Sequence, residues 1–321
     1  MGISVISKAS CDPATLPIGV WLTPHPLDRE SPFEIEWLKG LPGFDTTPMG
    51  EDGEPPLWRE HNVTLFESFR EQVGNDFKVA MQHMWPMFDG YVIESISVFI
   101  DYLNDWDMRY SPLGYSHEYS EPQKGSYIFN ISGGYLNDIL LQLHSGQPAD
   151  ITYKYTWEHE IIHLRDHREL VKLSAFKEGN SSCTHFIYYK LRFRSEGIAE
   201  LYYLLRTGFS SIRSIAEAKR LFVGRVQEVR QLCRSVSILT PAQTAVMENM
   251  NDFRMLGPWI MLSLLKSFEG RWHEDMITGV IHKLEQGEGL EHEHALIITQ
   301  IALRMKSDTY LLLLKDYLIN S

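Results

Sequence analysis

The stretch 156–163, which reads TWEHEIIH, decides how the rest of the chain is interpreted. It contains neither Gly nor Pro, so it favours a helix. On a helix, His159 and His163 lie one turn apart on the same face, where both imidazoles can reach one metal ion. Glu160 lies beside them, where it can take a proton from a water molecule at that metal. The stretch therefore predicts a hydrolytic metal site on a helix.

A third protein ligand is expected, because a catalytic zinc ion usually has three and keeps one position open. The segment 195–200, SEGIAE, supplies the best candidate. Ser195 is expected to cap a helix and so to place Glu196 in its first turn, while Gly197 leaves room for another helix to approach. Glu200 follows Glu196 by one turn on the same face. It is therefore the alternative third ligand, or the residue that orients a ligand histidine.

His167 is a further alternative, because it follows His163 by another four residues. On an uninterrupted helix it would lie about 12 Å along the axis from His159, which is too far for one ion. We therefore expect His167 to be solvated, or to support a ligand from outside the coordination sphere.

The two motifs resemble the zincin metallopeptidases, in particular the gluzincin group. In that group an HExxH helix is followed by a second helix that carries a ligand Glu, often in an E-G-x-A sequence. The matching segments here are HEIIH at 159–163 and EGIA at 196–199, and the resemblance covers roughly residues 125–206. It implies Zn²⁺ as the cofactor and a peptide or protein as the substrate. The residues that it implies are His159, His163 and Glu196 as zinc ligands, and Glu160 as the general base.

The fold class that follows from the resemblance is α+β, a zincin-like metallopeptidase core with a small mixed sheet and a largely helical C-terminal region. The segment 126–134, SYIFNISGG, predicts a strand that ends at a glycine pair. It is either the edge strand on which an extended peptide would lie, or an ordinary sheet strand. The expected domains are an acidic mixed region at 1–120, the core with edge strand, HExxH helix and Glu helix at 121–207, and a helical region at 208–321.

The last third of the chain has apolar residues at helical spacing. Residues 214–236 predict an amphipathic helix, Thr240 and the proline after it predict a helix start, and the segments 255–268 and 295–318 predict two more long helical stretches. In zincins such a region often donates a Tyr or His to the developing oxyanion. The candidates for this role on chemical grounds are Tyr202, Tyr203 and His273. The simpler role of each is packing in the core or exposure at the surface.

Composition and charge set the broader frame. A chain of 321 residues with 44% hydrophobic residues can bury a large core. Residues 1–150 hold 22 acidic and 8 basic side chains, a net charge of −14, which leaves +2 for the remainder out of the total of −12. This balance argues against a nucleic-acid partner.

The cysteine content and the hydropathy pattern bear on localisation. Three cysteines without a C-x-x-C pair argue against a disulfide framework and for the cytoplasm or another reducing compartment. An effector exported without a cleavable signal would have the same cysteine content. No signal-peptide pattern and no uncharged apolar run of spanning length occurs, so a soluble protein without a membrane span is expected.

Two other functional classes remain alternatives. The sequence has two ExxH pairs, Glu160 with His163 and Glu291 with His294, as di-iron carboxylate bundles do. The second pair follows the glycine-rich segment 287–289, where a solvent-facing helix start is expected. The other alternative is a non-catalytic zincin-fold or helical scaffold that binds a partner. Loss of catalysis usually shows as loss of the Glu or of a His, and all three residues persist here.

Overall fold

The computed structural model of the chain describes residues 18–23, 60–88, 95–101, 126–132, 155–177, 182–235, 239–247, 249–268 and 270–319. The chain divides into two compact units, Met1–Trp157 and Glu158–Ser321.

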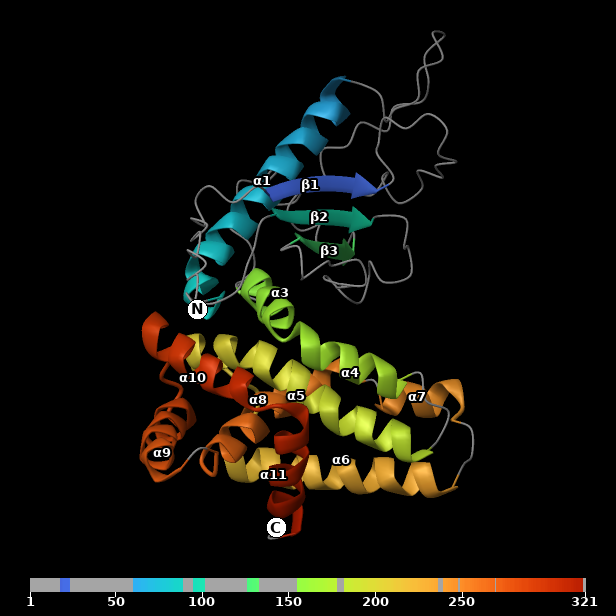
Figure 1. Cartoon of the computed structure of the whole chain (residues 1–321), viewed down its shortest axis with the longest axis vertical. Helices are drawn as coiled ribbons and strands as arrows, with labels where there is room; N and C mark the ends of the chain where they lie inside the picture. The colour runs from blue at the N-terminus through green and yellow to red at the C-terminus, as the bar shows by residue number, and fades with distance from the viewer. Residues whose placement is uncertain are drawn as a thin grey trace, which may run out of the picture. The chain divides into compact units, whose positions relative to one another are not determined.

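The first unit contains a small parallel sheet and one long helix (Figure 1). The strands β1 (Ile18–Thr23), β2 (Ser95–Asp101) and β3 (Ser126–Ser132) pair in the order β1-β2-β3. The helix α1 (Glu60–Met84) packs against β1 and continues into the 3₁₀ turn η3 (Trp85–Phe88). The helical face that α1 buries carries apolar residues at three- and four-residue spacing: Phe77, Ala80, Met81 and Met84.

The strand predicted at 126–134 is confirmed over Ser126–Ser132, and its glycine pair lies outside the described residues. Within the described sheet it pairs with β2 alone. The predicted fold class is wrong. The described part of the chain is plainly helical, not a zincin-like α+β core with a mixed sheet. The strands that are described run parallel and belong to the first unit, whereas His159 and His163 belong to the second. The HExxH pattern specifies a helix with two ligands, and this local requirement imposes no sheet around it.

The second unit is built from helices. Their bounds are α3 Thr156–Arg165, α4 His167–Lys177, α5 Ser182–Thr207, α6 Ile215–Ser235, α7 Pro241–Met247, α8 Met250–Leu265, α9 Arg271–Glu285, α10 His292–Arg304 and α11 Ser307–Ile319. The division between the units falls in the first turn of α3.

The helices α5 and α8 form the centre of this unit and contact each other along their lengths, with α4, α6, α10 and α11 packed around them (Figure 1). They approach most closely at Gly197 and Gly257. A Cβ atom on Gly197 would lie 2.6 Å from the Gly257 carbonyl oxygen, so a methyl group has no room there. The sequence-based expectation that a helix approaches at Gly197 is therefore confirmed, and that helix is α8.

Several helix predictions can be compared with the observed bounds. The helix expected at 214–236 is α6, and α7 begins after Thr240 as expected. The Gln243 amide donates to Thr240 Oγ1 at 3.3 Å and the Thr240 amide donates to Gln243 Oε1 at 2.8 Å, which is a capping box. The expected stretch 295–318 is interrupted. It divides into α10 and α11 at Met305, whose backbone is extended at φ −71° and ψ 96°.

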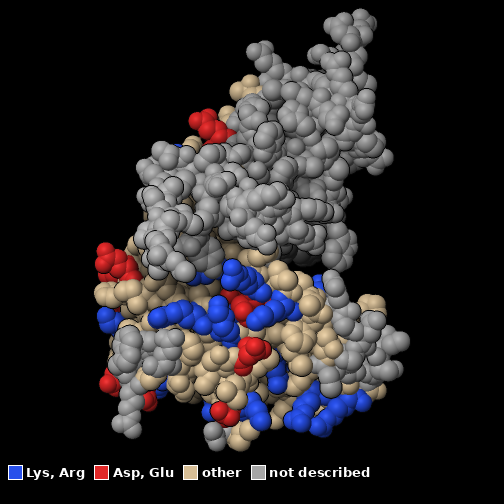
Figure 2. All heavy atoms as spheres, viewed as in Figure 1, with Lys and Arg blue, Asp and Glu red and all other residues tan. Residues whose placement is uncertain are grey.

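Both signs of charge occur on the surface of the second unit. Figure 2 shows Lys and Arg side chains over α4 and α10 and along α6, with Asp and Glu side chains between them. This mixture agrees with the net charge of +2 for residues 151–321. None of the described helices combines the length and the apolar character needed to cross a bilayer.

Candidate metal centre

The helix α3 holds the HEIIH residues in a buried setting. It follows Tyr155, which has a positive φ of 72° and turns the chain into the helix. Ile161 and Ile162 are fully buried, and His159 and His163 are each 6% exposed. The histidine pair is therefore buried, and so are the two apolar residues between the histidines.

Glu196 of α5 meets this histidine pair. The Nε2 atoms of His159 and His163 are 3.1 Å apart, and Glu196 Oε2 lies 3.5 Å from the first and 3.7 Å from the second. Three ligand atoms around a tetrahedral zinc ion lie about 3.3 Å apart when each bond to the metal is about 2.0–2.1 Å long. The three side chains thus have the spacing of a three-ligand zinc site.

The hydrogen bonding of Glu196 supports the same interpretation. Its Oε1 atom forms an ion pair with Arg192 Nη2 at 3.1 Å. Its Oε2 atom is buried and accepts no hydrogen bond within the described part of the chain. A buried carboxylate oxygen without a donor is costly, and a cation bound between Oε2 and the two imidazoles would remove that cost. The residues present therefore fit a metal ion.

The electrostatics favour positive charge at the same place. Burial would raise the pKa of Glu196, but Arg192 and the two histidines outweigh it and hold this pKa well below its usual range. Burial would lower the pKa of His159, but Glu200, Glu196 and Glu160 outweigh it and raise this pKa to about 10. Carboxylates that favour a proton on an imidazole also favour a metal ion beside it.

Glu160 lies beside the histidine pair. Its side chain is buried, with Oε1 4.0 Å from His159 Nε2, and its Oε2 atom has no hydrogen-bond partner in the described part of the chain. Burial raises the pKa of Glu160, and the neighbouring histidines only partly oppose this shift. A carboxylate with a raised pKa binds a proton more readily near neutral pH.

Polar side chains lie next to the Nδ1 atoms of both histidines. Glu200 Oε1 lies 3.3 Å from His159 Nδ1 and 3.2 Å from Arg254 Nε, and Ser195 Oγ lies 3.5 Å from His163 Nδ1. Both Nδ1 atoms therefore face these neighbouring side chains, and both Nε2 atoms lie on the side of Glu196. Of the two predicted alternatives, the structure brings Glu196 to the histidine pair and puts Glu200 on the far side of His159.

One local expectation around the site is wrong. Ser195 does not cap a helix, because α5 begins at Ser182 and continues unbroken through Ser195 and Glu196. Ser195 packs against His163 instead. The helix of the histidine pair ends before His167, since α3 ends at Arg165 and His167 begins α4. His167 is half-buried and lies outside the metal group, and burial lowers its pKa.

The remaining candidates lie elsewhere. Tyr202 is buried and its hydroxyl is 2.8 Å from His292 Nδ1, and the Tyr203 carbonyl accepts from Thr207 within α5. The side chain of His273 lies outside the described residues. In the second ExxH pair, Glu291 and His294 are exposed at the start of α10 and are not part of the metal group.

Sequence reasoning missed Arg192 and Arg254. Only the four-residue spacing from Arg192 to Glu196 could have indicated one of them.

Comparisons with protein-family models, curated proteins and solved structures find no match. The resemblance to gluzincins therefore stays a prediction from the two motifs. What the protein does must be argued from its own residues.

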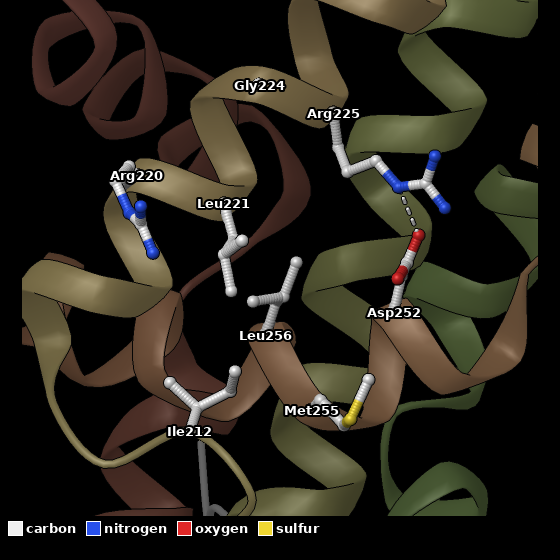
Figure 3. A pocket seen from close by; sticks show the side chains of 8 residues that line it. All are labelled: Ile212, Arg220, Leu221, Gly224, Arg225, Asp252, Met255 and Leu256. Atoms are coloured by element: carbon white, nitrogen blue, oxygen red, sulfur yellow. Dashed lines mark hydrogen bonds and ion pairs between the residues drawn. The ribbon is translucent and has the colours of Figure 1, made fainter.

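A hollow of about 290 Å³ lies between α6 and α8 (Figure 3). Leu221, Leu256 and Ile212 give it an apolar lining, and none of the metal group contributes to it. Its Arg225 and Asp252 bind each other, with Nε and Oδ2 2.6 Å apart. The hollow therefore offers no set of converging ligands comparable to the cluster on α3 and α5.

Proposed function

We propose that the protein is a zinc-dependent hydrolase that cleaves peptide bonds. The observation that carries the proposal is the cluster of His159, His163 and Glu196, whose ligand atoms have the separations of a tetrahedral zinc site. Two imidazole nitrogens and a carboxylate oxygen form a ligand set that suits zinc. The choice of a peptide bond as the target rests on the resemblance of the two motifs to metallopeptidases.

Each residue of the cluster has a role in this proposal. A zinc ion bound there would polarise the scissile carbonyl and lower the pKa of a water molecule. Glu160, which is buried beside His159, would accept the proton of that water and return it to the leaving amine. Glu200 would keep the His159 ring oriented through Nδ1.

The substitution Glu160→Gln tests the proposal, because it keeps the shape of the side chain and removes its basicity. We expect zinc content to be retained and hydrolysis of unfolded casein and of a mixture of internally quenched peptides to fall by about 10³-fold. His163→Ala should lose both metal and activity. Glu293→Gln, at an exposed position of α10, is the matched control and should leave both unchanged. Hydrolysis retained in pure Glu160→Gln protein would contradict the role of this carboxylate.

A further inference from the structure

Arg194 joins three segments that are far apart in the sequence. Its side chain is 2% exposed. Nη1 and Nη2 donate to the two carboxylate oxygens of Asp166 at 2.6 and 3.0 Å, and Nε and Nη2 donate to the Met305 carbonyl at 3.0 and 2.8 Å. Asp166 is the residue that connects α3 to α4, and Met305 lies in the turn between α10 and α11. A buried guanidinium on α5 therefore forms hydrogen bonds to both of these connections.

A second tether acts on the same turn. Glu169, in the first turn of α4, accepts the Ser307 amide with Oε2 at 2.8 Å and so caps α11 from another helix. We use the term Arg194 clamp for the side chains of Asp166, Glu169 and Arg194 with the backbone of Met305 and Ser307. All five residues are buried, and the clamp holds the turn between α10 and α11 against the start of α4 at two points.

The clamp lies next to the metal ligands along the chain. Asp166 follows His163 by three residues, and Arg194 precedes Glu196 by two. The ion pair between Asp166 and Arg194 therefore fixes α3 against α5, the two helices that supply all three ligands. Bond lengths at zinc tolerate deviations of only about 0.2 Å, so a small slip between these helices would weaken binding.

We propose that Arg194 is a positioning residue for the metal centre and couples it to the turn between α10 and α11. This inference rests on the proposed function only in requiring that the cluster binds metal. Coupling between two sites is reciprocal. Metal binding should therefore make the turn at 305–307 more rigid, and loosening the clamp should weaken metal binding.

A matched ion pair in the same unit separates positioning from general stability. Arg225 of α6 and Asp252 of α8 are 2.6 Å apart, the same separation as the shorter contact between Arg194 and Asp166 (Figure 3). Neither partner of this control pair contacts a residue of the metal group in the described structure. Weakening either pair is expected to cost stability, but only the Arg194 pair should change metal binding.

The test compares Arg194→Lys with Arg225→Lys, because lysine keeps the charge and loses the two-pronged geometry. Zinc affinity is measured by competition with a chelator, and the cobalt-substituted proteins are compared by visible absorption. We expect Arg194→Lys to bind zinc about 10–100-fold more weakly than wild type and to alter the cobalt spectrum. Arg225→Lys should change neither. Wild-type affinity and spectrum in folded Arg194→Lys protein would overturn the inference.

A measurement on the wild-type protein needs no variant that might fail to fold. Hydrogen exchange of the Met305 and Ser307 amides should slow when zinc is added to metal-free protein. Unchanged exchange at both amides, in protein that binds zinc, would overturn the coupling. Wild-type protein that binds no zinc would overturn both this inference and the proposed function. Protein that binds zinc, shows the coupling and hydrolyses no peptide would overturn the proposed function alone.

Discussion

Adding one methyl group at Gly197 should destabilise the second unit, although alanine is the better helix former. A Cβ atom there would lie 2.6 Å from the carbonyl oxygen, 2.7 Å from the carbonyl carbon and 3.0 Å from the Cα atom of Gly257. All three are backbone atoms, so no side chain can turn aside and α8 as a whole must move. Overpacking of this kind typically costs about 1–3 kcal/mol, and rigid backbone on both sides puts Gly197→Ala at the upper end of that range.

The helix propensity of alanine offsets about 1 kcal/mol of this cost, which leaves a net loss of about 2 kcal/mol. Gly224 of α6 is the control, because a Cβ atom there would meet no atom of the described residues within 4 Å. Gly224→Ala should therefore be more stable than wild type by about 0.5–1 kcal/mol. Urea unfolding followed by circular dichroism measures both variants. Equal midpoints for Gly197→Ala and Gly224→Ala would refute the close contact between α5 and α8.

Three further predictions follow from other contacts. Hydrogen bonds from Ser307 and Lys172 and the charge of Arg194 overcome the opposing effect of burial and lower the pKa of Glu169 from 4.5 to about 2. Its stabilisation is therefore present above pH 4.5 and is lost as the pH falls toward 2. Glu169→Gln should lower the free energy of unfolding by about 2 kcal/mol at pH 7. A difference from wild type in urea unfolding that did not shrink as the pH fell below 4.5 would contradict this. Glu200→Gln should weaken zinc binding by about 10-fold or more in chelator competition, because His159 Nδ1 loses its charged partner. Unchanged zinc affinity would show that Glu200 does not orient the His159 ring. Thr240→Ala should lower thermal stability by about 1 kcal/mol through loss of the α7 cap, whereas Thr240→Ser should be nearly neutral.

Local patterns in the sequence predicted local features of the structure. Apolar spacing predicted α6, the threonine-proline pair predicted the start of α7, and Gly197 indicated a close helix contact. The four-residue spacing of His159 and His163 likewise put both rings on one face. Each of these features depends on residues within a few positions of one another, and the physical rule that produces it acts at that range.

The contacts of Arg194 join residues that are far apart in the sequence. Arg194 pairs with Asp166 over 28 residues and binds the Met305 carbonyl over 111 residues, and no periodicity in the sequence records such a pairing. The break between α10 and α11 lies where Arg194 binds the Met305 carbonyl, whereas apolar spacing alone predicted one continuous stretch. Ser195 was assigned as a cap because its side chain suits that role. The helix that begins at Ser182 passes through it instead.

The most direct test of the proposed zinc centre is the metal content of the purified protein by elemental analysis, with His163→Ala and Glu196→Ala measured beside it. The geometry predicts one zinc ion per chain in wild type and loss or marked weakening in both variants. Absence of metal after careful reconstitution, or full zinc retention in both variants, would contradict the assignment of His159, His163 and Glu196 as its ligands.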